Sequence, residues 1–144
     1  MVEFTLRPCR SSDLREILAV EKAAFPDSPY SWPEFVYFLT WPGVGFTVAV
    51  TDERLVGYVT STGASDRGMI QSIAVSPEYR KRGIGRALMK SALEHLSMYE
   101  RVYLLVDRDN VAAISLYHMF AFKETGKVMR GYYKNGNDAI EMVR

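Results

Sequence analysis

YRKRGIGRAL, at residues 79–88, lies between an apolar segment and a segment with helical periodicity. The apolar segment, residues 69–75, has the composition of a strand. Gly83 and Gly85 have no Cβ, so the backbone can turn tightly there and approach a ligand closely. The next helix would offer free N–H groups and the positive end of its dipole. Four basic residues surround the turn, namely Arg80, Lys81, Arg82 and Arg86. The stretch therefore predicts an anion site suited to a diphosphate.

The spacing of the glycines distinguishes this turn from two other phosphate-binding loops. No Lys-Ser or Lys-Thr pair follows the glycines, and Leu88 stands where a dinucleotide-binding loop has its third glycine. The turn instead fits the pattern Gln/Arg-x-x-Gly-x-Gly/Ala, which is typical of the GNAT superfamily of acetyl-coenzyme A-dependent N-acetyltransferases. The chain resembles that superfamily. The alternative is a basic turn that only keeps the surface soluble.

Composition is typical of one soluble globular domain spanning residues 1–144, with 48% apolar and 24% charged residues. A net charge of +1 gives no overall attraction to nucleic acid or to an anionic membrane. Cys9 is the single cysteine, which excludes an internal disulfide and suits a reducing cytosol. We find no signal peptide and no apolar run of membrane-spanning length. We therefore expect a cytoplasmic protein, a monomer or a weak dimer.

Local patterns predict seven strands and four helices. The expected strands are residues 2–7, closed by Pro8, and residues 46–50, 55–59, 69–75, 101–106, 122–126 and 139–143. The first helix follows possible caps at residues 11–13 and has a stripe at helical spacing: Leu14, Ile17, Leu18, Glu21 and Phe25. The second begins with a capping box at residues 31–34, the third covers residues 84–98, and Asp109 or Asn110 caps the fourth.

This order of elements predicts a mixed sheet flanked by helices, in the α/β (α+β mixed) class. It resembles the GNAT fold, which has a mixed central β-sheet of about seven strands flanked by about four helices. The resemblance covers essentially the whole chain, so it does not depend on the glycine turn alone.

The resemblance implies that acetyl-coenzyme A is the co-substrate and that no metal is needed. The backbone of Ile73, Ala74 and Val75 would pair with the pantetheine arm as if with another strand. The pyrophosphate would sit on the N–H groups of residues 82–86, which include Gly83, Ile84 and Gly85. The basic side chains of Arg80, Lys81, Arg82 and Arg86 would be secondary contacts.

A second motif, Asn-x-x-Ala-x-x-x-Tyr, runs from Asn110 to Tyr117 and is followed by FAF at residues 120–122. Seven residues are about two helical turns, so Asn110 and Tyr117 lie on the same side of a helix. The resemblance implies that Asn110 binds the pantetheine region and that the Tyr117 hydroxyl protonates the coenzyme A thiolate. The spacing by itself favours a core aromatic at Tyr117. The family usually has glycine where this chain has Ala121.

The general base is not evident from the sequence. Related N-terminal acetyltransferases often carry Glu or His at the position of Leu105, and leucine cannot accept a proton. Three replacements stay open: Asp27, whose Phe-Pro-Asp segment resembles the Leu-Pro-Glu of some relatives, Asp107, or a water held by backbone carbonyls. His95 and His118 are weaker candidates, because His118 points about 100° away from Tyr117 around a helix.

Two further segments resemble the protein N-terminal acetyltransferases, including the ribosomal-protein alanine type. They are residues 24–35, AFPDSPYSWPEF, and residues 130–142, RGYYKNGNDAIEM. The resemblance implies that they clamp a peptide, or the N-terminus of a protein such as a ribosomal protein, through Phe25, Pro26, Tyr30, Tyr132 and Tyr133. An α-amine, with a pKa of about 7.7–8.0, is partly neutral at pH 7, whereas lysine at about 10.4 needs stronger deprotonation. The alternatives are a small-molecule amine or lysine as acceptor, or a non-catalytic module that binds acetyl-coenzyme A.

Overall fold

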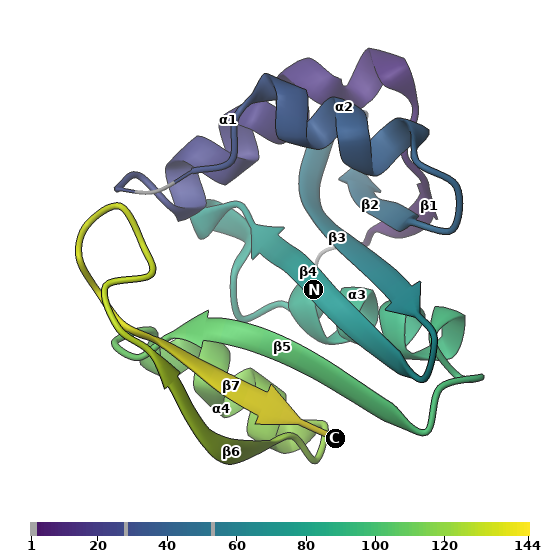
Figure 1. The fold of residues 1–144 in the computed structure, drawn as a ribbon. Coiled ribbons are helices and arrows are strands. Elements are labelled where there is room, and N and C mark those ends of the chain that lie inside the picture. Colours follow the sequence, from purple (N-terminus) through teal and green to yellow (C-terminus); the bar gives the residue numbers. More distant parts are fainter. Residues whose placement is uncertain (1–2, 28, 53) are drawn as a thin grey trace.

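A computed structural model describes residues 3–27, 29–52 and 54–144. The described residues form a seven-stranded sheet with helices on both faces (Figure 1). The strands are β1 (Thr5–Pro8), β2 (Gly45–Thr51), β3 (Arg54–Ala64), β4 (Arg67–Val75), β5 (Arg101–Asp107), β6 (Lys123–Met129) and β7 (Ala139–Val143). The α-helices are α1 (Leu14–Ala24), α2 (Trp32–Thr40), α3 (Ile84–His95) and α4 (Val111–Met119). The predicted class, strand number and helix number are confirmed.

The boundaries of several elements differ from the sequence prediction: β1 begins only at Thr5, β3 continues to Ala64 instead of Val59, and β6 continues to Met129 instead of Gly126. The first strand includes Pro8, which was expected to close it, and Val2 lies outside the described residues. Proline is tolerated because β1 pairs only with β2 and is an edge strand. Helix α3 ends at His95 rather than Met98, because the chain tightens into a turn in which the Tyr99 N–H donates to the Leu96 carbonyl.

The sheet is antiparallel except for one pair of strands. Its order is β1-β2-β3-β4-β5-β7-β6, and α3 connects β4 to β5 as a crossover. Strands β4 and β5 are parallel and pair only between residues 67–70 and 101–104. Beyond that point they diverge, as Figure 1 shows. The edge of β4 from Gln71 onward therefore has no neighbouring strand among the described residues.

A bulge on β4 lies at the point where the two strands separate. Thr60 of β3 pairs with Ser72, and Ser61 pairs with Ile70, so Gln71 is an extra residue with no partner on β3. The bulge changes which face each side chain joins. Ile70 packs in the core under α3, whereas Ala74 packs in the core under α1 and α2.

Two hydrophobic cores fill the opposite faces of the sheet. The α3 and α4 face contains Leu88, Met89 and Tyr117, and the α1 and α2 face contains Ile17, Phe35 and Tyr58. Alternation along β3 sends Tyr58 to one face and Val59 to the other. In the part of the chain that the structure describes, none of the helices has both the length and the apolar character that a bilayer crossing requires.

Candidate active site

The open edge of β4 presents backbone groups that the sheet does not use. The Ser76 N–H donates to the Val56 carbonyl at 2.8 Å, which makes Gly57 and Val75 a pair without hydrogen bonds between them. Because such pairs alternate, the N–H and C=O groups of Ile73 and Val75 point away from β3, into the space between β4 and β5. The groups of Ala74 point toward β3 instead. Among the three residues predicted here, Ile73 and Val75 supply the open edge.

The glycine turn lies next to this edge. Gly83 caps α3 in the left-handed region with φ 86°, and Lys81 is also left-handed with φ 61°. The first bond within α3 runs from the Ala87 N–H to the Gly83 carbonyl at 3.0 Å, so the three preceding N–H groups are free of helical partners. A Cβ on Gly85 would lie 3.6 Å from Leu116 and 3.7 Å from Val75. The start of α3, the end of β4 and α4 therefore meet at one place.

The four basic side chains of the turn are exposed and mostly make weak protein contacts. Arg80 Nε donates to the Val75 carbonyl at 3.4 Å, and the Arg82 guanidinium lies 5.5 Å from the centre of the Tyr79 ring. Arg86 Nη2 approaches Met119 Sδ of α4 at 3.9 Å. The basic side chains thus surround the turn on the protein surface, and the free N–H groups lie at the start of α3.

Helix α4 carries Tyr117, and its Leu116 lies near Gly85 at the start of α3. Asn110 caps the helix, since its Oδ1 accepts from the Ala113 N–H at 3.2 Å. Tyr117 is 6% exposed, and burial raises the pKa of its phenol well above the usual value. None of the described residues bonds to the Tyr117 hydroxyl. Thr60 Oγ1 is the one fully enclosed side-chain polar atom without a partner in the described parts of the chain, so the Tyr117 oxygen is not sealed off.

Tyrosines from two loops face the same space. Burial is the main cause of the raised pKa of Tyr133, and the negative charges that Tyr132, Asp107, Tyr30 and Tyr117 can carry raise it further. The Tyr132 and Tyr133 rings are neighbours, with their centres 5.0 Å apart. Figure 1 shows the β6–β7 loop beside the segment between α1 and α2. The loop that carries Tyr132 and Tyr133 therefore lies beside the segment that carries Tyr30, with Phe25 half-buried and Pro26 exposed nearby in that segment.

Hydrogen bonds hold the β6–β7 loop against the end of β5. Asn137 Nδ2 donates to both carboxylate oxygens of Asp107, at 3.3 and 3.0 Å. Arg108 pairs with Asp138 at 3.4 Å, and Asp138 Oδ1 accepts from the Gly131 N–H at 2.9 Å. Asp107 thus has a structural role that fixes the loop carrying Tyr133.

Residues 12–122 match the family described as acetyltransferase (GNAT). This chain belongs to the GNAT acetyltransferase family. The sequence is also 34% identical over 157 aligned residues to the N-alpha-acetyltransferase of Saccharolobus solfataricus, covering 99% of this chain and 93% of that protein. The predicted resemblance and the predicted class of enzyme, an acyltransferase, are confirmed.

Two solved structures share the fold of this GNAT protein over its full length. The ribosomal-protein-S18-alanine N-acetyltransferase of Escherichia coli superposes with a TM-score of 0.86 at 26% identity, covering 98% of this chain and 92% of that chain. A chain of the NatC complex bound to Gag peptide and CoA superposes with a TM-score of 0.86 at 26% identity, covering 98% of this chain and 97% of that chain.

The candidate bases of this GNAT protein differ in burial and in hydrogen bonding. Leu105 is half-buried, and alternation along β5 points it to the α1 and α2 face, opposite to Leu104. Asp27 is exposed, and none of the described residues forms a hydrogen bond or ion pair with its carboxylate. His118 is exposed and its Nδ1 lies 3.1 Å from the Phe122 carbonyl, whereas His95 lies near Gly45 at the far end of α3.

One buried acid was missed by the sequence analysis. Glu21 is 2% exposed and hydrogen-bonded to Tyr30 and Tyr58. Its position in the apolar stripe of α1 was a usable signal, because an acid at a buried position of a helix needs partners. The identity of those partners depends on β3, which the stripe does not predict.

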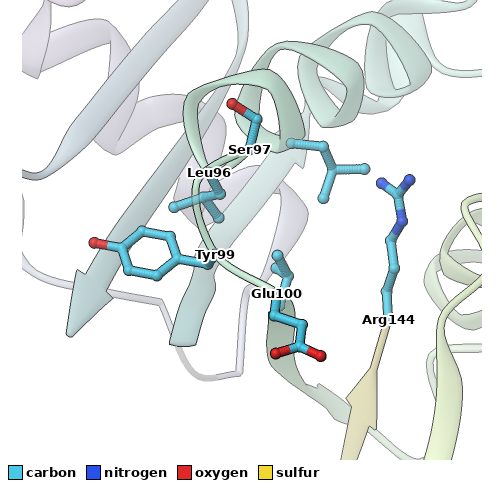
Figure 2. A pocket seen from close by; sticks show the side chains of 7 residues that line it. Leu96, Ser97, Tyr99, Glu100 and Arg144 are labelled. Atoms are coloured by element: carbon cyan, nitrogen blue, oxygen red, sulfur yellow. The ribbon is translucent and has the colours of Figure 1, made fainter. Parts of the chain in front are cut away.

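The cavity in Figure 2 lies away from these residues. It has a volume of about 460 Å³ and is lined by the end of α3, by Tyr99 and Glu100 before β5, and by Arg144. Asp107 stands at the opposite end of β5, about 20 Å away at the usual rise per strand residue. In the described ranges, no group of three His, Cys, Asp or Glu residues is arranged to hold a metal ion.

Proposed function

We propose that this GNAT protein transfers the acetyl group of acetyl-coenzyme A to the N-terminal α-amine of a protein or peptide. One observation carries the proposal: the open edge of β4 leads directly to the free N–H groups of α3, and Gly85 there lies near Leu116 of α4, the helix whose Tyr117 hydroxyl has no partner among the described residues. A single extended ligand with amides, a diphosphate and a leaving thiolate matches these three features in order.

The donor site fits acetyl-coenzyme A through backbone groups. Ile73 and Val75 can pair with the amides of the pantetheine arm as an added strand would. The N–H groups of Ile84, Gly85 and Arg86 are suited to the diphosphate, because they point along the positive end of the helix dipole. Arg80, Lys81 and Arg82 add charge around the turn, and Asn110 retains its amide N–H₂ for the arm while its oxygen caps α4.

Tyr117 is suited to protonate the departing thiolate. A raised pKa keeps the phenol protonated across the neutral range, so its proton is available to a strong base formed in the reaction. Its hydroxyl has no competing partner in the described parts of the chain. We assign the role of general acid to Tyr117 on this basis.

The acceptor site fits an extended peptide better than a small free amine. Tyr30, Tyr132 and Tyr133 come from two loops that face each other across the separation between β4 and β5, with Phe25 and Pro26 on the α1–α2 side. Aromatic walls with hydroxyl groups can pack on a peptide and bond to its backbone. The names of the relatives support this proposal, and the alanine-specific relative makes ribosomal protein N-termini suitable first substrates.

An assay of thiol release from acetyl-coenzyme A tests the proposal. We expect turnover with lysine-free peptides that have a free N-terminus and none with the same peptides blocked at the N-terminus. Equal rates on both would contradict an α-amine acceptor. Turnover with polyamines or lysine side chains alone would favour the small-molecule alternative, and tight coenzyme A binding without turnover would favour the non-catalytic one.

Tyr117→Phe tests the general acid. The variant removes only the hydroxyl, so we expect kcat to fall by roughly 10²–10⁴-fold, the usual contribution of acid catalysis, with coenzyme A affinity unchanged. Tyr37→Phe, on the exposed surface of α2, is the matched control and should retain full activity. A Tyr117→Phe variant with wild-type kcat would show that another group, or water, protonates the thiolate.

A further inference from the structure

A chain of three polar side chains crosses the sheet face under α1. The Tyr58 hydroxyl, from β3, donates a hydrogen bond to Glu21 Oε1. The same hydroxyl lies 2.7 Å from Ser72 Oγ on β4. Glu21 is 2% exposed and Tyr58 is fully buried, whereas Ser72 is half-buried. The chain therefore connects a buried carboxylate to a hydroxyl that is not sealed off.

Counting protons shows which group donates each hydrogen bond between these three side chains. Tyr58 has one hydroxyl proton, and that proton is directed to Glu21. The bond between Tyr58 and Ser72 must then be donated by Ser72, because the Tyr58 oxygen can only accept there. The single hydroxyl proton of Ser72 is thereby used, so the outer side of its oxygen is left as an acceptor.

The free side of Ser72 lies next to the open edge of β4. Ser72 directly precedes Ile73, whose backbone groups point into the space between β4 and β5. Its side chain is on the α1 and α2 face, as its bond to Tyr58 requires. Tyr30, on the acceptor side of that space, is held by the same carboxylate, because the Tyr30 N–H donates to Glu21 Oε2 at 2.8 Å.

We propose that Ser72, Tyr58 and Glu21 form a proton relay that takes up the proton leaving the acceptor amine. This inference rests on the proposed transfer of acetyl to an α-amine. As the new C–N bond forms, an amine proton moves to Ser72 Oγ, the Ser72 proton moves to the Tyr58 oxygen, and the Tyr58 proton moves to Glu21 Oε1. The C–S bond breaks and the thiolate takes the Tyr117 proton. The relay returns its proton to solvent by the reverse path after the product leaves.

The surroundings of Glu21 favour proton uptake. Burial raises the pKa of its carboxyl, Glu34 of α2 raises it further, and the bonds from Tyr30 and Tyr58 partly offset this. A raised pKa makes the carboxylate a stronger base than one in water. The other carboxylates in this region lack a path to β4: Asp107 is bonded to Asn137, Glu141 accepts from Thr125 at 2.9 Å, and Asp27 is exposed.

The test is the pH dependence of kcat/KM for a lysine-free peptide from about pH 4 to pH 9, a range that begins below the ordinary pKa of a glutamate and therefore covers a raised pKa of Glu21. The α-amine must lose one proton to react, so a protein without a titrating base gives a limiting slope of one in log(kcat/KM) against pH. If Glu21 must also be ionised, the limiting slope on the acid side is two. We expect a slope of two for the wild-type protein.

Three variants interrupt the relay at different points. Ser72→Ala removes the outer end of the relay, and Tyr58→Phe removes its middle hydroxyl. In Glu21→Gln the amide oxygen can still accept from the Tyr30 N–H, but the amide N–H₂ donates to Tyr58 and so reverses the direction of the hydrogen bonds. We expect each to lower kcat/KM at pH 7 by about tenfold or more and to reduce the limiting slope to one. Thr60→Val is the matched control, because Thr60 pairs with Ser72 across the sheet and its buried hydroxyl has no partner. It should keep the wild-type rate and slope.

Each outcome decides the question. A slope of one in an active wild-type protein overturns the relay, and so does a Ser72→Ala variant with the wild-type rate and slope. A uniform loss of rate with the slope kept at two assigns the three residues a structural role only. A slope reduced by Asp27→Asn instead assigns the base to Asp27. If no peptide is acetylated by the wild-type protein, the proposed function fails, and this result is distinct from all of these. Thermal unfolding and coenzyme A binding of each variant, compared with the wild-type protein, exclude misfolding.

Discussion

Alanine substitutions at the two glycines of the turn should have opposite effects on stability. A Cβ on Gly83 would have no atom within 4 Å, so Gly83→Ala causes no clash. The cost comes from its φ of +86°, a left-handed conformation that costs an L-residue about 1–2 kcal/mol. A domain of this size loses about 3–4 °C in Tm for each kcal/mol. We therefore expect Gly83→Ala to lower Tm by roughly 3–8 °C.

Gly85→Ala should have the opposite effect on stability. Gly85 is inside α3, and its Cβ would make ordinary contacts with Leu116 at 3.6 Å and Val75 at 3.7 Å. Alanine is a better helix former than glycine by up to about 1 kcal/mol. The motif Gln/Arg-x-x-Gly-x-Gly/Ala accepts alanine at this position, so the methyl group should leave the free N–H groups accessible to a diphosphate. We expect an unchanged or higher Tm together with an unchanged affinity for coenzyme A.

The assays are thermal unfolding followed by circular dichroism and titration calorimetry with coenzyme A, neither of which depends on turnover. A Gly85→Ala variant whose affinity for coenzyme A is at least about tenfold lower would refute this reasoning. An equally large loss in a charge-removing variant such as Arg82→Gln would show that the basic side chains, and not only the backbone, hold the diphosphate.

Two further substitutions test the fold itself. Ala121 has φ 68° directly after α4, where the Phe122 N–H donates to the Tyr117 carbonyl. Glycine adopts this left-handed conformation more easily, so Ala121→Gly should raise the free energy of unfolding by about 1 kcal/mol. A lower Tm in thermal unfolding would contradict this. Arg7 donates hydrogen bonds to both carboxylate oxygens of Asp13 and lowers the pKa of that carboxyl. The ion pair therefore stabilises the folded protein above the unfolded pKa of about 3.9, and its contribution is lost as the pH falls. Asp13→Asn should therefore lower Tm at pH 7 and lower it less near pH 3, whereas an equal loss at both would exclude the ion pair as the cause.

Local signals explain why the order of the elements could be predicted from the sequence. The capping box places the start of α2, since Glu34 accepts from the Ser31 N–H at 2.5 Å as expected. Asn110 likewise caps α4 through the Ala113 N–H. Each signal involves residues three positions apart, so no distant part of the chain is needed to interpret it.

The separation of β4 from β5 could not be predicted in the same way. It depends on a register in which Ile70 pairs with Leu104 and the following residues of β4 do not pair with β5. The bulge at Gln71 depends on β3 as well, because it is defined by the pairing of Thr60 and Ser61. Periodicity within one segment contains no information on its register with another segment, and the paired residues Ile70 and Leu104 lie 34 positions apart in the chain.

The acceptor side was harder to predict than the donor side for the same physical reason. The donor features lie within β4, the turn and the start of α3, which are contiguous in the chain. The acceptor features come from Glu21 and Tyr30, from Tyr58, and from the β6–β7 loop, which meet only in the folded protein. Strand β4 joins the two sides, since Ile73 directs its backbone to the open edge while the adjacent Ser72 directs its side chain to the α1 and α2 face. Neighbouring residues on a strand are about 3.3 Å apart, so a group bound by the Ile73 backbone lies within reach of the Ser72 hydroxyl. Changes in the acceptor loops should therefore alter which amine is acetylated, while the donor site and this contact point stay the same.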